Sequence, residues 1–301
     1  MKRISSYCIF LMALLAANLC YGQSAKQVIR FGLISDIQYC DCEPRGSRFY
    51  RNSIAKLDSC VDAINQQKVQ FTLNLGDIID RNPKDLDTVL KSLSRLDKKV
   101  YNTPGNHDYA GVKDNKQLHD KLGMPEEYYS FKKGNWRFIM LNTNEVASYA
   151  NVAGTWKEGA LKQMYADYKA ATGHEAADYN GGISSTQLAW LEDQLKASQK
   201  KGESVLIFSH HPMSCAKGLT ALNDREILGM VAGYKCVKAL IAGHHHSGAF
   251  CYEGTLPVVV VEGMVETAGQ NAYGIVELYP NKLVLKGHGR MLSRTLDFDK
   301  P

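Results

Sequence analysis

The chain has 301 residues, of which 45% are hydrophobic and 22% are charged, a balance typical of a globular protein. This composition excludes an intrinsically disordered chain, and the sequence contains neither an internal repeat nor a low-complexity segment. The formal net charge is only +5 and no long basic run occurs, so we predict no nucleic-acid partner.

The first 22 residues have the pattern of a secretory signal peptide. A basic start at residues 2–3 precedes an apolar run from Cys8 to Leu19, and small or polar residues follow up to Gly22, after which we predict cleavage. The apolar run is shorter than the roughly 20 residues that cross a bilayer, so an uncleaved anchor is the weaker alternative. A lipoprotein signal would need a small residue before Cys20, where leucine stands. We therefore predict an exported protein without a stable membrane anchor, and removal of residues 1–22 takes two basic residues and lowers the net charge to +3.

Six cysteines remain beyond the predicted cleavage point, and export would permit them to form disulfides. They are Cys40, Cys42, Cys60, Cys215, Cys236 and Cys251. A chain of this length does not need disulfides for stability, and the sequence alone assigns no pairing. The Cys-Asp-Cys spacing at 40–42 is too tight for the usual structural zinc site.

Apolar strands alternate with amphipathic helices over the first hundred residues. Short runs rich in β-branched side chains predict strands, and apolar residues at helical spacing predict helices. The predicted strands cover residues 28–34, 71–75 and 99–101, and the predicted helices cover residues 49–67 and 85–96. This alternation indicates an α/β sheet with helical cover.

The middle of the chain is less regular, and the last third returns to the α/β pattern. A helix at 114–122 and a hairpin of strands 128–132 and 136–141 lead into a polar stretch at 144–182. We interpret this stretch, with one helix at 159–171, as a substrate-selecting insertion. Helices then follow at 184–200 and 224–231, and strands at 205–208, 237–241, 257–262, 272–278 and 282–286. No Pro/Gly/Ser-rich linker divides residues 23–301, which we predict to form one domain.

Polar side chains that bind metals well follow five of the apolar strands. They stand in Ser35-Asp36-Ile37-Gln38, Gly76-Asp77, Gly105-Asn106-His107-Asp108, Ser209-His210-His211 and Gly243-His244-His245-His246. Each motif by itself could be a turn, a helix cap or a solvated histidine cluster. Loops at the carboxyl ends of strands collect ligands, however, and five such motifs in one chain are improbable by chance. We therefore predict a metal centre held by Asp36, Gln38, Asp77, Asn106, His210, His244 and His246.

The ligand types indicate two divalent ions and an anionic substrate. A carboxylate can bridge two ions about 3.5–4 Å apart that together clamp a phosphoryl group, and Asp77 is the candidate bridge. Imidazole suits Zn, Fe and Mn, whereas carboxylate and amide oxygens suit harder ions. Two carboxylates do not neutralise two dications, so the centre stays positive. His107 is the candidate general acid for the leaving oxygen, with Asp108 placed to orient its ring.

Together these motifs resemble the calcineurin-like metallophosphoesterases, whose pattern is Asp-x-His, Gly-Asp, Gly-Asn-His-Asp/Glu, a later His and Gly-His-x-His. The resemblance implies a four-layer α/β/β/α sandwich of two mixed β-sheets flanked by helices. It also implies two ligand sets, namely Asp36, Gln38, Asp77 and His246 for one ion, and Asp77, Asn106, His210 and His244 for the other. His107 would be the histidine that acts in the transition state.

Gln38 stands where most members of that family have His, and this departure is typical of a narrower group. The chain resembles the manganese-dependent ADP-ribose/CDP-alcohol diphosphatases at residues 31–39, 48–51, 179–182, 187–191, 262–267 and 279–290. The resemblance implies that the pyrophosphate bond of a nucleoside diphosphate conjugate is cleaved to release a nucleoside monophosphate. It implies two divalent ions, with Mn²⁺ favoured over Fe or Zn because an amide oxygen is a harder and weaker ligand than imidazole.

Substrate contacts and competing functions stay open in the sequence. Arg48 and Arg51 could bind the second phosphate through guanidinium forks, or could be exposed arginines at a helix start. Cys251 could line a nucleobase pocket, or could be a buried cysteine or half of a disulfide. A phosphomonoesterase, a cyclic-nucleotide phosphodiesterase and a non-catalytic binding protein of the same fold are the alternatives to the diphosphatase. The sequence indicates a small phosphorylated nucleotide as the partner and indicates no oligomeric state.

Overall fold

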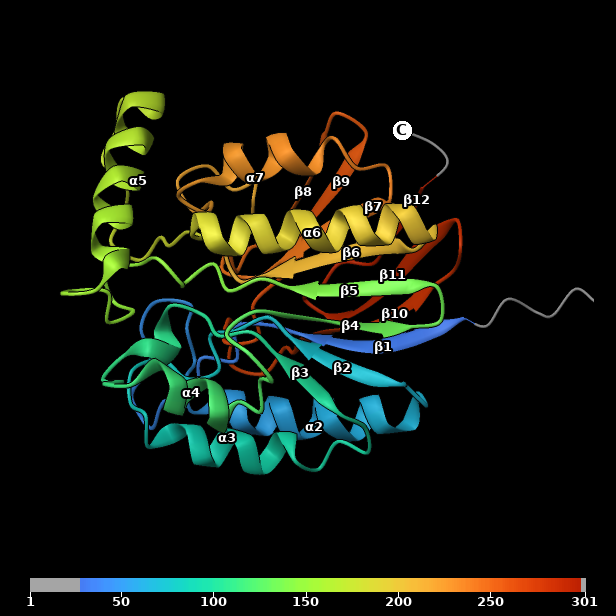
Figure 1. Ribbon diagram of the computed structural model, residues 1–301. Coiled ribbons are helices and arrows are strands. Elements are labelled where there is room, and N and C mark those ends of the chain that lie inside the picture. Colours follow the sequence, from blue (N-terminus) through green and yellow to red (C-terminus); the bar gives the residue numbers. More distant parts are fainter. Residues whose placement is uncertain (1–27, 299–301) are drawn as a thin grey trace, which may run out of the picture.

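The computed structural model describes residues 28–298 and contains two six-stranded mixed sheets (Figure 1). The first sheet contains both the first strand, β1, and the last strand, β12. The predicted signal peptide, residues 1–22, lies outside the described residues. In strand order the sheet contains β12 (Arg294–Asp297), β11 (Lys282–Gly289), β10 (Ala272–Leu278), β1 (Ile29–Ile34), β2 (Phe71–Asn74) and β3 (Val100–Asn102). β1, β2 and β3 run parallel, and β10, β11 and β12 add antiparallel pairs on the other side of β1.

The second sheet also has a parallel centre with antiparallel edges. Its strand order is β4 (Tyr129–Lys133), β5 (Trp136–Met140), β6 (Ser204–Ser209), β7 (Val237–Ala242), β9 (Leu256–Val260) and β8 (Ala249–Glu253). β5, β6, β7 and β9 are parallel, whereas β4 and β8 pair antiparallel with their neighbours. The short strands β8 and β12 were not predicted, because a run of four or five residues with at most one buried side chain carries little periodic signal.

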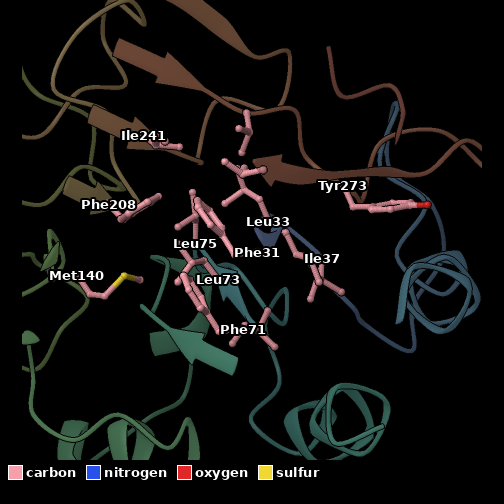
Figure 2. Packing of buried hydrophobic residues seen from close by; sticks show 14 of the residues in the cluster. Phe31, Leu33, Ile37, Phe71, Leu73, Leu75, Met140, Phe208, Ile241 and Tyr273 are labelled. Atoms are coloured by element: carbon pink, nitrogen blue, oxygen red, sulfur yellow. The ribbon is translucent and has the colours of Figure 1, made fainter. Parts of the chain in front are cut away.

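Aromatic side chains from both sheets interlock between the layers. Phe31 of β1 stacks on Phe71 of β2 with ring centroids 5.1 Å apart, and Phe138 of β5 meets these two rings edge-on at 5.7 and 5.1 Å. Figure 2 shows Phe31 and Phe71 packed in one cluster with Phe208 of β6. Burial of each such ring contributes about 1.5–3 kcal/mol, so this layer fixes the distance between the two sheets.

Helices cover the outer faces of both sheets, which completes four layers. α2 (Asn52–Gln66) and α3 (Asp85–Leu93) lie on the first sheet, and α6 (Ser185–Lys201) and α7 (Asp224–Val231) lie on the second (Figure 1). α6 begins where Ser184 accepts a hydrogen bond from the Gln187 amide and ends at Gly202 in the left-handed conformation. The predicted α/β/β/α sandwich is therefore confirmed. Within residues 28–298, no helix combines the length and the apolar character that crossing a membrane requires.

The segment 144–182 contributes the helix that stands apart from these layers. α5 (Trp156–Thr172) lies beyond the end of the second sheet (Figure 1), capped by Thr155 at its start and Gly173 at its end. Of its side chains only Leu161 is fully buried, in a small cluster with Val146, Val152 and Leu222. The remaining short elements are η1 (His107–Tyr109) and α4 (Asn115–Lys121), which lie between β3 and β4.

Candidate metal centre

The predicted ligands meet because the parallel strands of both sheets end at the same edge of the molecule. From the first sheet, Asp36 and Gln38 follow β1, Asp77 follows β2 and Asn106 follows β3; from the second, His210 follows β6, and His244 and His246 follow β7. Five of these side chains are fully buried, and those of Asn106 and His244 are partly exposed. The chain thus brings together all seven residues predicted as metal ligands.

One cluster gathers around Asp36. Ligand atoms of Asp36, Asp77 and His246 all lie within 4.8 Å of one another, and His246 Nε2 is 3.5 Å from Asp36 Oδ1. Gln38 donates its side-chain N–H to Asp77 Oδ2 over 2.9 Å. The Gln38 Oε1 atom remains buried with no hydrogen-bond partner among residues 28–298. These four side chains correspond to the ligand set that the resemblance assigns to the first ion.

A second cluster gathers around His210 Nε2. This atom lies 3.1 Å from Asn106 Oδ1, 3.4 Å from Asp77 Oδ1 and 3.1 Å from His244 Nδ1. The opposite ring atom, Nδ1, donates to the carbonyl oxygen of Leu75 over 2.8 Å, which fixes the ring and leaves Nε2 for a metal. Asp77 therefore belongs to both clusters, as a bridging carboxylate must.

His211 lies beside the second cluster, but hydrogen bonds occupy both of its ring nitrogens. Its ligand atoms approach those of His210 and His244, and its ring is 4.5 Å from the His244 ring. Both ring nitrogens are already engaged, because Thr143 donates its hydroxyl to Nδ1 over 2.9 Å and Nε2 donates to the Tyr179 carbonyl over 2.9 Å. Burial and the neighbouring His210 lower the pKa of His211 to about 3. His211 is therefore a neutral packing partner of the ligands.

Four of the ligands have a backbone conformation that side chains rarely adopt. The φ angles are 53° at Asp36, 42° at Gln38, 52° at Asp77 and 67° at His244. Each such residue costs of the order of 1–3 kcal/mol and persists only where its surroundings enforce it. One close approach contributes to this conformation, because a Cβ at Gly105 would overlap the backbone nitrogen and carboxylate of Asp77. The strained turns point the ligand side chains into one space at the strand ends.

Carboxylates and imidazoles in the centre shift one another's pKa values. Burial alone would raise the pKa of the Asp77 carboxyl, but the neighbouring His210 holds this pKa well below its usual range. Burial alone would lower the pKa of His246, but hydrogen bonds with Asp36 and Glu266 raise it to about 9. Burial alone would also lower the pKa of His210, but the neighbouring Asp77 carboxylate raises it to about 9. The carboxylates thus hold protons on imidazoles at positions that a metal cation would take.

The donor set fits two divalent ions. Buried polar atoms in proteins are almost always hydrogen-bonded, yet Gln38 Oε1 and His244 Nε2 have no partner among residues 28–298. Nitrogen and oxygen donors of this mixture suit Mn, Fe or Zn. The two clusters share Asp77, so its carboxylate is the side chain that could serve both ions.

His107 lies at the mouth of the centre with its ring held from behind. Its backbone N–H donates to Asp77 Oδ1 over 2.9 Å, and its Nδ1–H donates to the Asp80 carbonyl oxygen over 2.7 Å. The Asp80 carboxylate is 3.3 Å from the same Nδ1. The predicted orienting role of Asp108 is wrong, because its carboxylate accepts the backbone N–H groups of Ile78, Ile79 and Gly105 instead. Asp80 orients the ring, and Asp108 holds the loops that carry Asp77 and His107.

The predicted substrate contacts separate in the structure. Arg48 lines a cavity of about 1060 Å³ over the metal centre, and its Nε lies 4.0 Å from Glu266 Oε1. Arg51 does not line this cavity, because its guanidinium pairs on the surface with Asp41 and Glu43 at 2.6 and 2.5 Å. The alternative of an exposed arginine at a helix start therefore applies to Arg51.

Cys251 is half of a disulfide and not a free thiol in a nucleobase pocket. It pairs with Cys215, with the two Cα atoms 5.6 Å apart, and so ties the loop after β6 to β8. A second disulfide joins Cys40 to Cys42, and Cys60 and Cys236 are free and buried.

Three residues of the site had no assigned role in the sequence. Glu266 accepts a hydrogen bond from His246 Nδ1 over 2.8 Å, and Asp80 holds His107. Tyr179 lines the metal cavity and also a neighbouring cavity of about 1250 Å³, and its ring centroid is 5.8 Å from that of His244. Glu266 and Tyr179 lie in segments that carried the family resemblance and Asp80 follows the Gly76-Asp77 motif, but nothing in the local pattern distinguished them from their neighbours.

Known proteins resemble this chain in sequence and in structure. The chain matches the family described as calcineurin-like phosphoesterase over residues 29–248. A manganese-dependent ADP-ribose/CDP-alcohol diphosphatase of Oryza sativa subsp. japonica is 30% identical and aligns over 93% of this chain and 97% of its own. The human protein of the same name is 29% identical over 93% and 95%. A crystal structure of a dimetal phosphatase from Danio rerio has a TM-score of 0.81 and 28% identity, and covers 90% of this chain and 99% of that one.

The family match extends over well more than half of the chain and contains every predicted ligand. Its near-full-length relatives are named as manganese-dependent, which agrees with a donor set built for two divalent ions. The resemblance that the five strand-end motifs indicated is confirmed, and the chain belongs to the calcineurin-like phosphoesterase family of metal-dependent hydrolases.

Proposed function

We propose that the protein hydrolyses the pyrophosphate bond of nucleoside diphosphate conjugates such as ADP-ribose and CDP-choline, and releases a nucleoside monophosphate. The observation that carries this proposal is the pair of cavities that share Tyr179, one over the metal centre and one beside it. Together they offer room for a two-part substrate on either side of a diphosphate. The names of the near-full-length relatives support the same reaction.

Arginines give the metal cavity a place for a second phosphate. Arg45 and Arg48 both line it, and the Arg48 side chain is partly exposed to the space. A guanidinium binds phosphate oxygens with two parallel hydrogen bonds, so Arg48 is suited to the phosphate that is not held by the centre. A substrate with a single phosphate would leave this group unused.

The segment 144–182 is the part of the chain that selects the substrate. It supplies Tyr179 and Asp178 to the metal cavity, and Met164 and Tyr168 of α5 to the wall of the neighbouring cavity. Hydrogen bonds hold the end of this segment in place, from the Asn180 side chain to the Gly218 carbonyl and from the Leu222 amide to the Gly181 carbonyl. Tyr179 thus presents an exposed aromatic ring from a fixed backbone.

His107 protonates the leaving oxygen. When bound, a pair of divalent ions clamps a phosphoryl group and lowers the pKa of water enough for attack near neutral pH. The Asp80 carbonyl accepts the Nδ1 proton of His107, so Nε2 is the ring atom left to deliver a proton into the cavity. The Asp80 carboxylate, 3.3 Å from the same Nδ1, helps to hold the ring in this orientation.

Product release from three substrates tests the proposal. The protein from Gln23 onward, loaded with Mn²⁺, would be incubated with ADP-ribose, CDP-choline and p-nitrophenyl phosphate, with a metal-stripped sample as the control. Faster release of AMP or CMP than of p-nitrophenol supports the diphosphatase. Preference for p-nitrophenyl phosphate would contradict it in favour of a phosphomonoesterase, and preference for an added cyclic nucleotide would favour a phosphodiesterase.

We also propose that the protein is exported and acts outside the cytoplasm. The signal-peptide pattern of residues 1–22 supports export. The disulfides Cys40–Cys42 and Cys215–Cys251 support it as well, because disulfides form and persist in oxidising compartments. Expression of the full chain, followed by fractionation and N-terminal sequencing, tests the proposal. A protein that starts near Gln23 outside the cytoplasm supports it, whereas an intact Met1 end in the cytoplasm would contradict it.

A further inference from the structure

A buried lysine on the inner side of α2 ties down the chain beside the metal centre. The side chain of Lys56 is buried, and its Nζ donates to the backbone carbonyls of Met264, Glu266 and Thr267, the last two over 3.1 and 3.0 Å. An ammonium group has three donors and no acceptor, so these three carbonyls match its full capacity. Lys56 stands in the middle of a helix face that otherwise buries apolar residues such as Leu57 and Val61.

The tied segment, residues 264–267, lies directly against the turn that carries Asp36. The Met264 amide donates to the Ser35 carbonyl over 3.1 Å, and the Val265 amide donates to the Asp36 carbonyl over 2.9 Å. Thr267 has a φ of 63°, a strained conformation for a β-branched residue. The lysine therefore compensates for a backbone path that the segment would not adopt by itself.

This path places one carboxylate behind a metal ligand. Glu266 accepts the Nδ1 proton of His246 over 2.8 Å, which leaves His246 Nε2 facing Asp36 at 3.5 Å. A carboxylate behind a ligating histidine fixes its tautomer and its ring orientation, and loss of such a partner typically costs about 10–100-fold in metal affinity. Because Lys56 bonds the carbonyls of Met264, Glu266 and Thr267, it sets where this carboxylate lies.

We propose that Lys56 is a positioning residue of the metal centre, which acts through residues 264–267 and Glu266 on the affinity of the His246 side of the centre for a divalent ion. The proposal deepens the centre on which the proposed function rests, but it concerns metal binding and needs no substrate. A role in folding alone would lower the thermal stability of the protein without changing the affinity of either ion.

Manganese binding without substrate separates these two roles. Mn²⁺ titrations followed by electron paramagnetic resonance of the free ion would be made on the wild type, Lys56→Met, Lys56→Gln and Ile64→Val. Ile64 is a buried apolar residue near the other end of the same helix and serves as a structural control. We expect Lys56→Met to weaken one of two Mn²⁺ sites about 10-fold or more and to leave the other unchanged. Ile64→Val should lower only the melting temperature.

A double mutant tests the route of the effect. Glu266→Ala should weaken the same single site, and Lys56→Met combined with Glu266→Ala should add little to it, because both act on one interaction. Two unchanged Mn²⁺ affinities in both Lys56 variants, or losses that add fully in the double mutant, would overturn the proposal. If Lys56→Met does not fold, Lys56→Gln carries the test, since its amide keeps two of the donors. Failure of the diphosphatase assay would leave this result untouched, so the two proposals fail separately.

Discussion

Gln38 donates its side-chain N–H to Asp77 Oδ2 over 2.9 Å, and this bond leaves the Gln38 carbonyl oxygen buried and without a hydrogen-bond partner in residues 28–298. One side chain thus orients the carboxylate that we predict to bridge the two ions and offers a ligand atom of its own. Histidine in this position would offer a softer nitrogen and could not make both contacts in the same way.

Exchange of Gln38 for histidine should change the metal preference. We expect Gln38→His to raise activation by Zn²⁺ relative to Mn²⁺ by about 10-fold, because imidazole suits Zn²⁺ better than an amide oxygen does. Activity measured against increasing concentrations of each metal gives this ratio. Wild-type protein already activated better by Zn²⁺ than by Mn²⁺ would show that the amide does not set the preference.

Removal of the imidazole of His107 should separate catalysis from metal binding. We expect His107→Ala to lower kcat by about 10²–10⁴-fold, since the leaving oxygen loses its proton donor. Metal content measured by elemental analysis should stay at the wild-type level, because the ring nitrogens of His107 do not belong to either ligand cluster. His288→Ala, at an exposed position on β11, is the control and should keep the wild-type rate. An unchanged kcat in His107→Ala would remove this residue from the mechanism.

The sequence predicted the candidate metal ligands because each of them follows a strand that its own apolar residues identify. An apolar run that ends in Asp, Asn or His identifies both a strand and its ligand, and the parallel order of strands then brings the ligands together. The errors have a common physical cause. Asp108 is adjacent to His107 in sequence, but the short helix η1 turns its carboxylate back onto backbone amides, whereas Asp80 reaches the ring from another strand end.

Contacts that depend on how the chain turns and packs carry no local signal in the sequence. Arg48 and Arg51 were equivalent candidates in the sequence, and only the fold turns Arg51 toward Asp41 and Glu43. The same holds for the bonds of Lys56, whose partners lie more than two hundred residues further along the chain. The partners of Lys56 are brought to α2 because residues 264 and 265 bond the backbone of Ser35 and Asp36.

A methyl group at Gly105 should disrupt the metal centre by steric overlap. Its Cβ would overlap the backbone nitrogen and carboxylate of Asp77, which are too rigidly held to move away. We expect Gly105→Ala to lower the free energy of unfolding by about 1–3 kcal/mol and to reduce Mn²⁺ binding. Gly159→Ala is a matched control inside α5, where a Cβ meets no atom within 4 Å and alanine favours the helix. Equal Mn²⁺ binding in both variants would show that Asp77 tolerates a shift.

Metal binding should release protons and strengthen as the pH rises. The pKa values of His210 and His246 are raised to about 9 in the metal-free protein, so both rings carry a proton near pH 7.5 that a metal must displace. The sign for stability is the opposite one: these raised pKa values stabilise the metal-free fold fully below about pH 6.5, and this contribution is lost as the pH rises through 9.

Calorimetric Mn²⁺ titrations at pH 6.5, 7.5 and 8.5, each in buffers of different ionisation enthalpy, give the number of protons released. We expect up to about two protons per protein at pH 7.5, fewer at pH 8.5, and the weakest Mn²⁺ binding at pH 6.5. His211 should contribute nothing, because its pKa of about 3 keeps it neutral across this range. Binding that releases no protons at pH 7.5 would mean that the carboxylates do not hold protons on these imidazoles, and the affinity should then be independent of pH above 6.5.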